Sequence, residues 1–107
     1  MRSFRLIVGV TLPIGFLQDR LKLHGPRSLK EKLRLILPLK LKLQGLFSVA
    51  CAEMPELNHL QLAVLGFSCV SNSDIQARKM LGQIVRYLNS SKSQFEVVDH
   101  YLEVIVF

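Results

Sequence analysis

The chain has 107 residues, of which 50% are hydrophobic and 21% charged, so it can bury one core and is too apolar to be disordered. We predict a single domain, residues 1–107. Residues 1–45 carry ten lysines and arginines against two acids, whereas residues 46–107 carry four against six, which gives the net charge of +6. This asymmetry indicates an anionic partner, RNA or anionic lipid, or else a solvated helix face. Two cysteines exclude a disulfide framework and a four-cysteine zinc site.

Residues 6–17 are an apolar run that follows Arg2 and Arg5, much as in a signal peptide. The run lacks a small-residue cleavage site and is too short to span a bilayer, so we predict a buried strand over residues 4–12 instead. Residues 13–15 should interrupt this strand. Residues 16–20 should then form an extra turn before residues 21–23 resume an extended conformation.

A helix should begin after Ser28, because a serine followed three residues later by Glu31 forms a capping box. This first helix is predicted to run from Leu29 to about Gln44, to end at Gly45 and to kink at Pro38. The leucine–lysine alternation after the proline favours a strand instead. The capping box and the helical spacing of the leucines before the proline outweigh that alternative.

Residues 47–54 and 59–70 are apolar segments on either side of residues 55–58, which predicts a hairpin with an open loop. The second strand of this hairpin is apolar on both faces, although a sheet face that meets water should be polar. We therefore expect that face to be covered by a second copy of the chain, packed sheet to sheet or edge to edge. The alternative cover is the long first connection, residues 13–24.

Ser73 and Gln76 form a second capping box, and Asp74 suits the positive end of the helix that follows. Residues 89–93 are predicted to be a loop, and residues 95–106 the last strand, whose even-numbered positions are mostly apolar. The apolar residues of the second helix follow helical spacing and are Ala77, Met80, Leu81, Ile84 and Leu88.

The predicted order, β-α-β-β-α-β, is that of the α+β ferredoxin-like fold, an antiparallel sheet with both helices on one face. Five segments have the composition and spacing of a known family: Gly25–Lys32, Ala52-Glu53, Asn58–Gln61, Ala63–Gly66 and Val70–Asn72. Through them the chain resembles the YlxP-like family of small conserved bacterial proteins, a domain of unknown function. The resemblance implies the same fold. Genes of that family often lie beside genes for translation initiation and ribosome maturation, so it also implies a cytoplasmic accessory of ribosome assembly or translation.

No catalytic site is predicted. His24, His59 and His100 have no cysteine or acidic residue at metal-ligand spacing, so we expect no metal and no cofactor. The sequence has no phosphate-binding loop, no nucleophile elbow and no dinucleotide fingerprint. The protein is therefore predicted not to be an enzyme.

The candidate site is a cationic patch at the start of the first helix, made of Arg27, Ser28, Lys30 and Lys32. A helix N-terminus favours anions, so this patch is a hypothesis for anion or RNA binding. Glu31 opposes it, because a carboxylate that caps the helix occupies a donor that an anion would need. Plain capping with solubilising lysines is the alternative. The strands lack the aromatic sequence of an RNA-recognition motif, so contact should involve phosphates, without DNA sequence readout.

Two functions remain. The first is a cytoplasmic, non-enzymatic accessory that contacts ribosomal RNA or ribosome-assembly factors through the basic first helix. The second is a homodimeric scaffold that binds a protein or small ligand through the apolar sheet face. A membrane partner is not expected. Salt should distinguish the two functions, because electrostatic RNA binding weakens steeply with ionic strength and an apolar interface does not.

Overall fold

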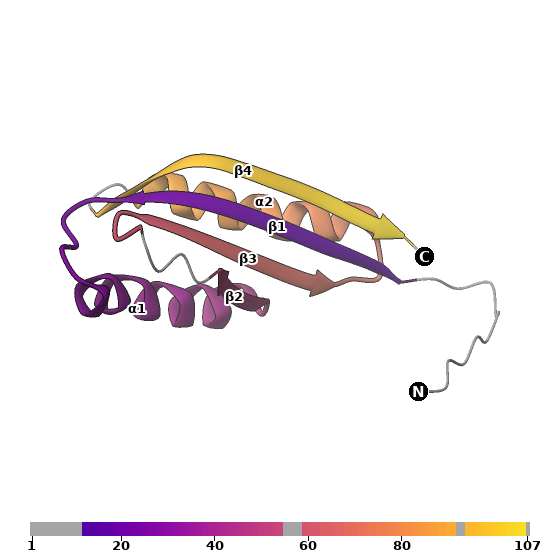
Figure 1. Ribbon diagram of the computed structural model, residues 1–107. Coiled ribbons are helices and arrows are strands. Elements are labelled where there is room, and N and C mark those ends of the chain that lie inside the picture. The colour runs from indigo at the N-terminus through magenta and orange to yellow at the C-terminus, as the bar shows by residue number, and fades with distance from the viewer. Residues whose placement is uncertain (1–11, 55–58, 92–93, 107) are drawn as a thin grey trace, which may run out of the picture.

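The computed structural model describes residues 12–54, 59–91 and 94–106. Its strands form one antiparallel sheet in the order β2-β3-β1-β4. The predicted order of elements and the ferredoxin-like α+β fold are confirmed. The elements are β1 (Pro13–Leu23), α1 (Leu29–Phe47), β2 (Ala50–Met54), β3 (Leu62–Val70), α2 (Asp74–Ser90) and β4 (Phe95–Val106) (Figure 1).

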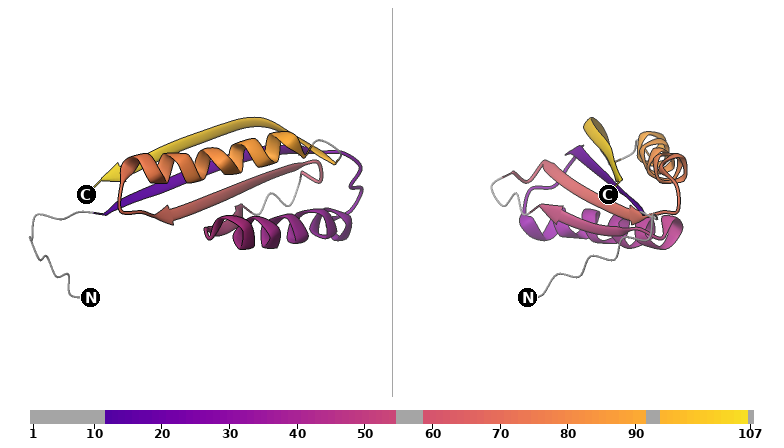
Figure 2. Two further views of the ribbon diagram at one scale, coloured as in Figure 1. Left: turned by 180° about the vertical axis from the view of Figure 1, so that it is seen from behind. Right: turned by 90° about the vertical axis from the view of Figure 1, so that its right-hand side faces the viewer.

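The core lies between the sheet and the two helices. The odd-numbered residues of β1 and β3 form one face of the sheet and share a single buried cluster with residues of both helices. α2 contacts β1 and β4, and α1 contacts β2 (Figure 2). The helices contribute Ile36 and Leu43 from α1 and Ala77, Leu81, Ile84 and Leu88 from α2, all buried.

The first strand differs from its prediction. β1 is continuous, so the predicted interruption at residues 13–15 and the predicted turn at residues 16–20 are wrong. Pro13 is tolerated because it is the first residue of the strand, where a missing N–H disturbs the hydrogen-bond ladder least. Of the strand predicted at residues 4–12, only Leu12 lies within the described residues, and it precedes β1.

Gly15 is a close-packing position within β1. A Cβ atom at Gly15 would lie 2.8 Å from Cδ1 of Leu81, 3.1 Å from Sγ of Cys69 and 3.4 Å from Cβ of Ala77. α2 can therefore approach the sheet closely at this point because residue 15 has no side chain.

The first helix is longer than predicted. α1 continues through Pro38 and Gly45 and ends at Phe47, so both the predicted end at Gly45 and the alternative strand are wrong. Ser48 closes the helix in the left-handed region, with φ 50° and ψ 47°, and its N–H donates to the carbonyl of Gln44 over 3.1 Å. A glycine commonly takes this position, and here a serine does so.

The predicted hairpin is present with shorter strands. β2 begins at Ala50 rather than at residue 47, because residues 47 and 48 belong to the end and the cap of α1. β3 begins at Leu62 rather than at residue 59. The open loop predicted at residues 55–58 lies outside the described residues.

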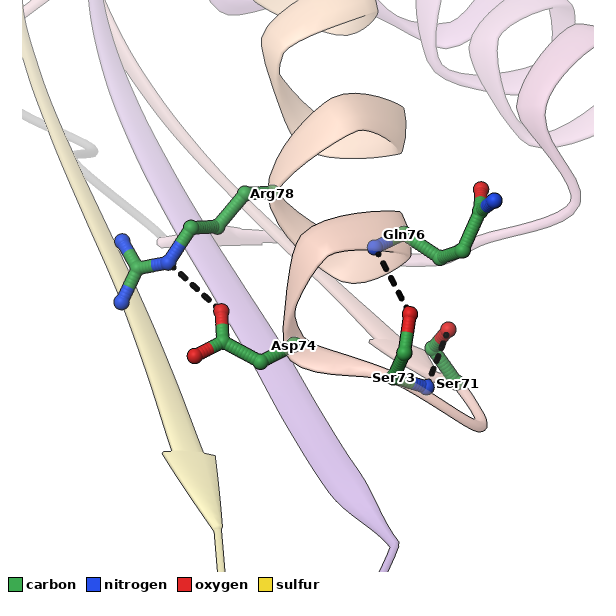
Figure 3. A network of polar contacts seen from close by, with 5 residues as sticks. All are labelled: Ser71, Ser73, Asp74, Gln76 and Arg78. Carbon is green, nitrogen blue, oxygen red and sulfur yellow. Dashed lines mark hydrogen bonds and ion pairs between the residues drawn. The ribbon is translucent and has the colours of Figure 1, made fainter.

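The second capping box is present in part: Ser73 caps the helix, but the N–H of Ser73 donates to Oγ of Ser71 over 3.4 Å and not to the side chain of Gln76. The N–H of Gln76 donates to Oγ of Ser73 over 3.1 Å, and Nε of Arg78 lies 2.7 Å from Oδ1 of Asp74, one helical turn away (Figure 3). Of the predicted apolar positions, only Met80 is partly exposed. α2 ends at Ser90, so the first two residues of the loop predicted at residues 89–93 belong to the helix.

β4 covers the predicted residues but contains a bulge. Its register shifts between Arg20 and Leu21 of β1, which leaves Val98 as an extra residue. A single extra residue reverses which side chains face the core. The core-facing residues are therefore odd-numbered before the bulge and even-numbered after it: Phe95, Val97, Leu102 and Val104.

Candidate anion-binding end

One end of the molecule gathers five chain segments: the ends of β1 and α2 and the beginnings of α1, β3 and β4 (Figure 1). We call it the loop end. Backbone hydrogen bonds connect its segments, since the N–H of Leu23 donates to the carbonyl of Gln61 and the N–H of His24 to that of Gln94, each over 2.8 Å. Nε2 of Gln61 donates to the carbonyl of Pro26 over 3.2 Å. The loop before α1 is thus fixed to two other segments.

The capping box at the start of α1 is confirmed. Oγ of Ser28 accepts the N–H of Glu31 over 3.1 Å, and Oε2 of Glu31 accepts the N–H of Arg27 over 2.9 Å. Ser28 itself is extended, with φ −148°. The Glu31 carboxylate therefore occupies one backbone donor near the helix N-terminus and places a negative charge there, so a bound anion would depend on the cationic side chains.

The structure separates the predicted site residues. Arg27 and Lys30 are exposed, and Ser28 is half-buried as the cap. Lys32 is only 2% exposed, and its Nζ donates to the carbonyl of His59 over 3.0 Å. Its ammonium group therefore lies inside the loop end, where it connects α1 to the segment before β3, and not on the surface with the other cations.

This placement predicts a structural effect for Lys32. Lys32→Met keeps most of the side-chain volume but leaves the His59 carbonyl without this donor, so the free energy of unfolding should fall by about 1 kcal/mol. The control Lys30→Met changes an exposed position and should stay within about 0.5 kcal/mol of the parent. Urea unfolding followed by circular dichroism measures both. Equal stabilities of the two variants would contradict a structural role for Lys32.

Arg34 is a cation of the loop end that the sequence prediction missed. It is exposed and lines a hollow of about 270 Å³ beside the helix N-terminus. Its position four residues after Lys30 places both side chains on one side of the helix, and this spacing could have identified it. The other residues of the hollow are His24, Gly25, Pro26, Glu31, Leu35 and Gln94.

Two further hollows open at the same end. One, of about 360 Å³, is formed by Lys22, residues 59–61 and Leu62, and another, of about 310 Å³, includes His24 and Glu96. The exposed cations of this end are Lys22, Arg27, Lys30 and Arg34, against the exposed acids Glu31 and Glu96. The loop end therefore carries an excess of positive charge and contains hollows, two features that suit a phosphate-binding surface.

The described residues offer little for catalysis. Within residues 12–54, 59–91 and 94–106, no three His, Cys, Asp or Glu side chains are grouped so that they could hold a metal ion. Burial raises the pKa of the Cys51 and Cys69 thiols, which disfavours the reactive thiolate. Across the same residues, no helix has the length and apolar character needed to cross a membrane.

Asp19 is a buried carboxyl on the core side of β1. It is 0% exposed, and neither of its oxygens has a hydrogen-bond partner among the described residues. Burial raises its pKa from 3.8 to about 6, and the positive charge of His100, opposite on β4, partly offsets this shift. Asp19 does not line any of the hollows at the loop end, so we expect it to influence stability rather than binding.

Comparison with known proteins places the chain in a family without assigning it a reaction. The search of curated proteins returned no match. A family model described as a protein of unknown function, DUF503, matches residues 14–102, from the second residue of β1 to the middle of β4. Because this match covers most of the sequence, the chain belongs to the DUF503 family.

Proposed function

We propose that this protein is a non-enzymatic, cytoplasmic accessory of ribosome assembly or translation that contacts RNA through its loop end. The observation that carries the proposal is the group of exposed cations Arg27, Lys30 and Arg34 around the N-terminus of α1. The resemblance to the YlxP-like family, with its translation-related gene neighbours, supports the choice of ribosomal RNA.

RNA would be held chiefly by its phosphates. The guanidinium groups of Arg27 and Arg34 can each bind a phosphate through two parallel hydrogen bonds, and Lys30 adds a point charge. Three contacts of this kind position a backbone and do not read bases. The partner should therefore be recognised by shape and charge, as in a folded RNA helix.

The triple variant Arg27→Ala, Lys30→Ala, Arg34→Ala tests the proposal, with Ser28, Glu31 and Lys32 retained so that the cap and the buried lysine stay intact. Its affinity for a labelled RNA stem-loop, measured by fluorescence anisotropy at low salt, should fall by about tenfold or more. The slope of log affinity against log salt should flatten by about one unit for each phosphate that the variant no longer binds.

A matched control removes the same charge elsewhere. Lys42→Ala, Lys79→Ala, Arg86→Ala also deletes three exposed cations from helices, away from the start of α1. This control should keep most of the parent's affinity. If both triple variants lose the same affinity, RNA responds only to net charge and the loop end is not the site. If neither loses affinity, the proposal fails.

The alternative function, a dimeric scaffold, depends on a different surface. Exposed apolar side chains lie on the face of the sheet that the helices leave uncovered, among them Phe16 and Tyr101. Phe67, the aromatic residue of β3, is 1% exposed and belongs to the core, so it is not part of that surface.

A further inference from the structure

The outer face of the sheet is the face turned away from both helices, formed by the even-numbered residues of β1 and β3 and their neighbours in β2 and β4. Val64 on this face is buried, at 3% exposure, but many large apolar neighbours are not. The exposed ones are Phe16 at 37%, Met54 at 49%, Val70 at 64%, Tyr101 at 54% and Ile105 at 44%.

The exposed apolar area of the outer face is large enough for one side of a protein–protein interface. Five large side chains, each about half exposed and each with roughly 200 Å² of surface, leave on the order of 500 Å² of apolar area on this face. A stable interface of standard size buries about 800 Å² on each partner, of which a little more than half is apolar, or roughly 450 Å². The outer face can therefore supply one side of a standard interface.

Small residues form the middle of the β2 and β3 half of the outer face. A mostly apolar hollow of about 300 Å³ lies over Ala50, Ala52, Gly66 and Ser68, with Phe16 as one wall, and the larger Met54 and Val70 lie at its two ends. The β4 side carries large residues, Tyr101 and Ile105. Tyr101 is level with the hollow, because Gln18 of β1 pairs with both Tyr101 and Gly66, and Gly66 pairs with Ala52.

We infer that a second copy of this chain packs on the outer face, related to the first by a two-fold axis that runs parallel to the strands, above the middle of the outer face and between the two copies. This operation keeps each residue at its level along the strands and places β4 of one copy over β2 of the other. Tyr101 of each copy then enters the hollow over Ala52 of the other. The hollow and Tyr101 are therefore complementary between the two copies, as a symmetric dimer requires.

Charge on the outer face favours a protein over RNA as the occupant. Arg20 pairs with Asp99 and Lys22 with Glu96 across β1 and β4, so opposite charges adjoin. Glu103 adds an unmatched acid and accepts the hydroxyl of Tyr101 over 2.6 Å. The described charges of this face thus leave a small negative excess, which repels a phosphate backbone but permits protein contact.

Sedimentation equilibrium of the full chain over a dilution series tests the dimer. The parent should be a dimer at micromolar concentration. Ala52→Arg should fill the hollow with a charged side chain and raise the dimer Kd at least about tenfold, and Tyr101→Ala should raise it about 30-fold. Both positions are exposed in the single chain, so its fold should persist, as the far-ultraviolet circular dichroism spectrum checks.

The control Ile75→Arg replaces a 77% exposed apolar residue on α2 and should leave the dimer Kd unchanged. A parent that stays monomeric up to about 1 mM would overturn the inference, because such a Kd corresponds to a very weak contact. A dimer that survives both Ala52→Arg and Tyr101→Ala would also overturn it. So would a monomer whose RNA affinity falls with Tyr101→Ala, since the occupant would then be RNA. The inference is independent of the function proposed for the loop end.

Discussion

Replacing Asp19 with asparagine should raise the free energy of unfolding at pH 7 by up to about 3 kcal/mol, the equivalent of two pKa units. Burial raises the pKa of this carboxyl from 3.8 to about 6, so the folded protein holds the proton more tightly than the unfolded chain does. The stability that this proton provides is complete below pH 3.8 and is lost as the pH rises through about 6. Asparagine has no charge to desolvate, so the variant does not lose stability when the pH rises through this range.

Urea unfolding at several pH values measures the effect. The parent should lose stability between about pH 4 and pH 7, and Asp19→Asn should flatten that part of the profile. Asp99→Asn is the matched control, because it makes the same substitution at an exposed position of β4 close to His100. A parent profile that rises over this range would contradict the burial of an ionisable Asp19.

Replacing Gly15 with alanine should lower the free energy of unfolding by about 2 kcal/mol, because the new Cβ overpacks the core. The Cβ would lie 2.8 Å from Cδ1 of Leu81, which is itself fully buried, and 3.1 Å from Sγ of Cys69. Either α2 must move away from β1 or both side chains must leave their preferred rotamers.

Gly66→Ala provides the matched control on the other face of the sheet. There the nearest atom to a new Cβ would be Cε1 of Phe16 at 3.6 Å, an ordinary contact. Because alanine restricts the unfolded chain more than glycine does, the free energy of unfolding of this variant should rise by up to about 0.5 kcal/mol. Chemical unfolding at low protein concentration compares the two. Equal effects would mean that strand propensity, and not the contact with α2, determines the outcome.

The fold was predictable where local rules determine the element. The helix starts at Ser28 and Ser73 were predicted correctly because each serine accepts the N–H of the residue three positions later, although Gln76 does not return the second bond of a capping box. The extent of β1 was not predictable from local rules. Proline and glycine usually interrupt a strand, so Pro13 and Gly15 indicated a break. Only the close approach of α2 shows why a glycine is needed within the strand. The left-handed Ser48 and the bulge at Val98 likewise depend on tertiary packing.

The candidate site was predictable in part. Arg27 and Lys30 are exposed as the patch hypothesis requires, whereas Lys32 is buried. Its spacing contained the signal, since Lys32 lies four residues before Ile36 on the stripe that α1 buries. The burial of Lys32 was not predicted because lysine is charged and is rarely buried without a partner. That partner, the His59 carbonyl, lies 27 residues away in sequence, so local rules do not identify it.

The most direct test of the proposed function is the salt dependence of RNA binding by the unmodified protein. Affinity for a labelled RNA stem-loop, measured by fluorescence anisotropy over a series of salt concentrations, should fall with a log–log slope of about −2 to −3 if three phosphates are contacted. A slope near zero, or no binding at the lowest salt, would contradict the proposal that the loop end of this protein holds RNA.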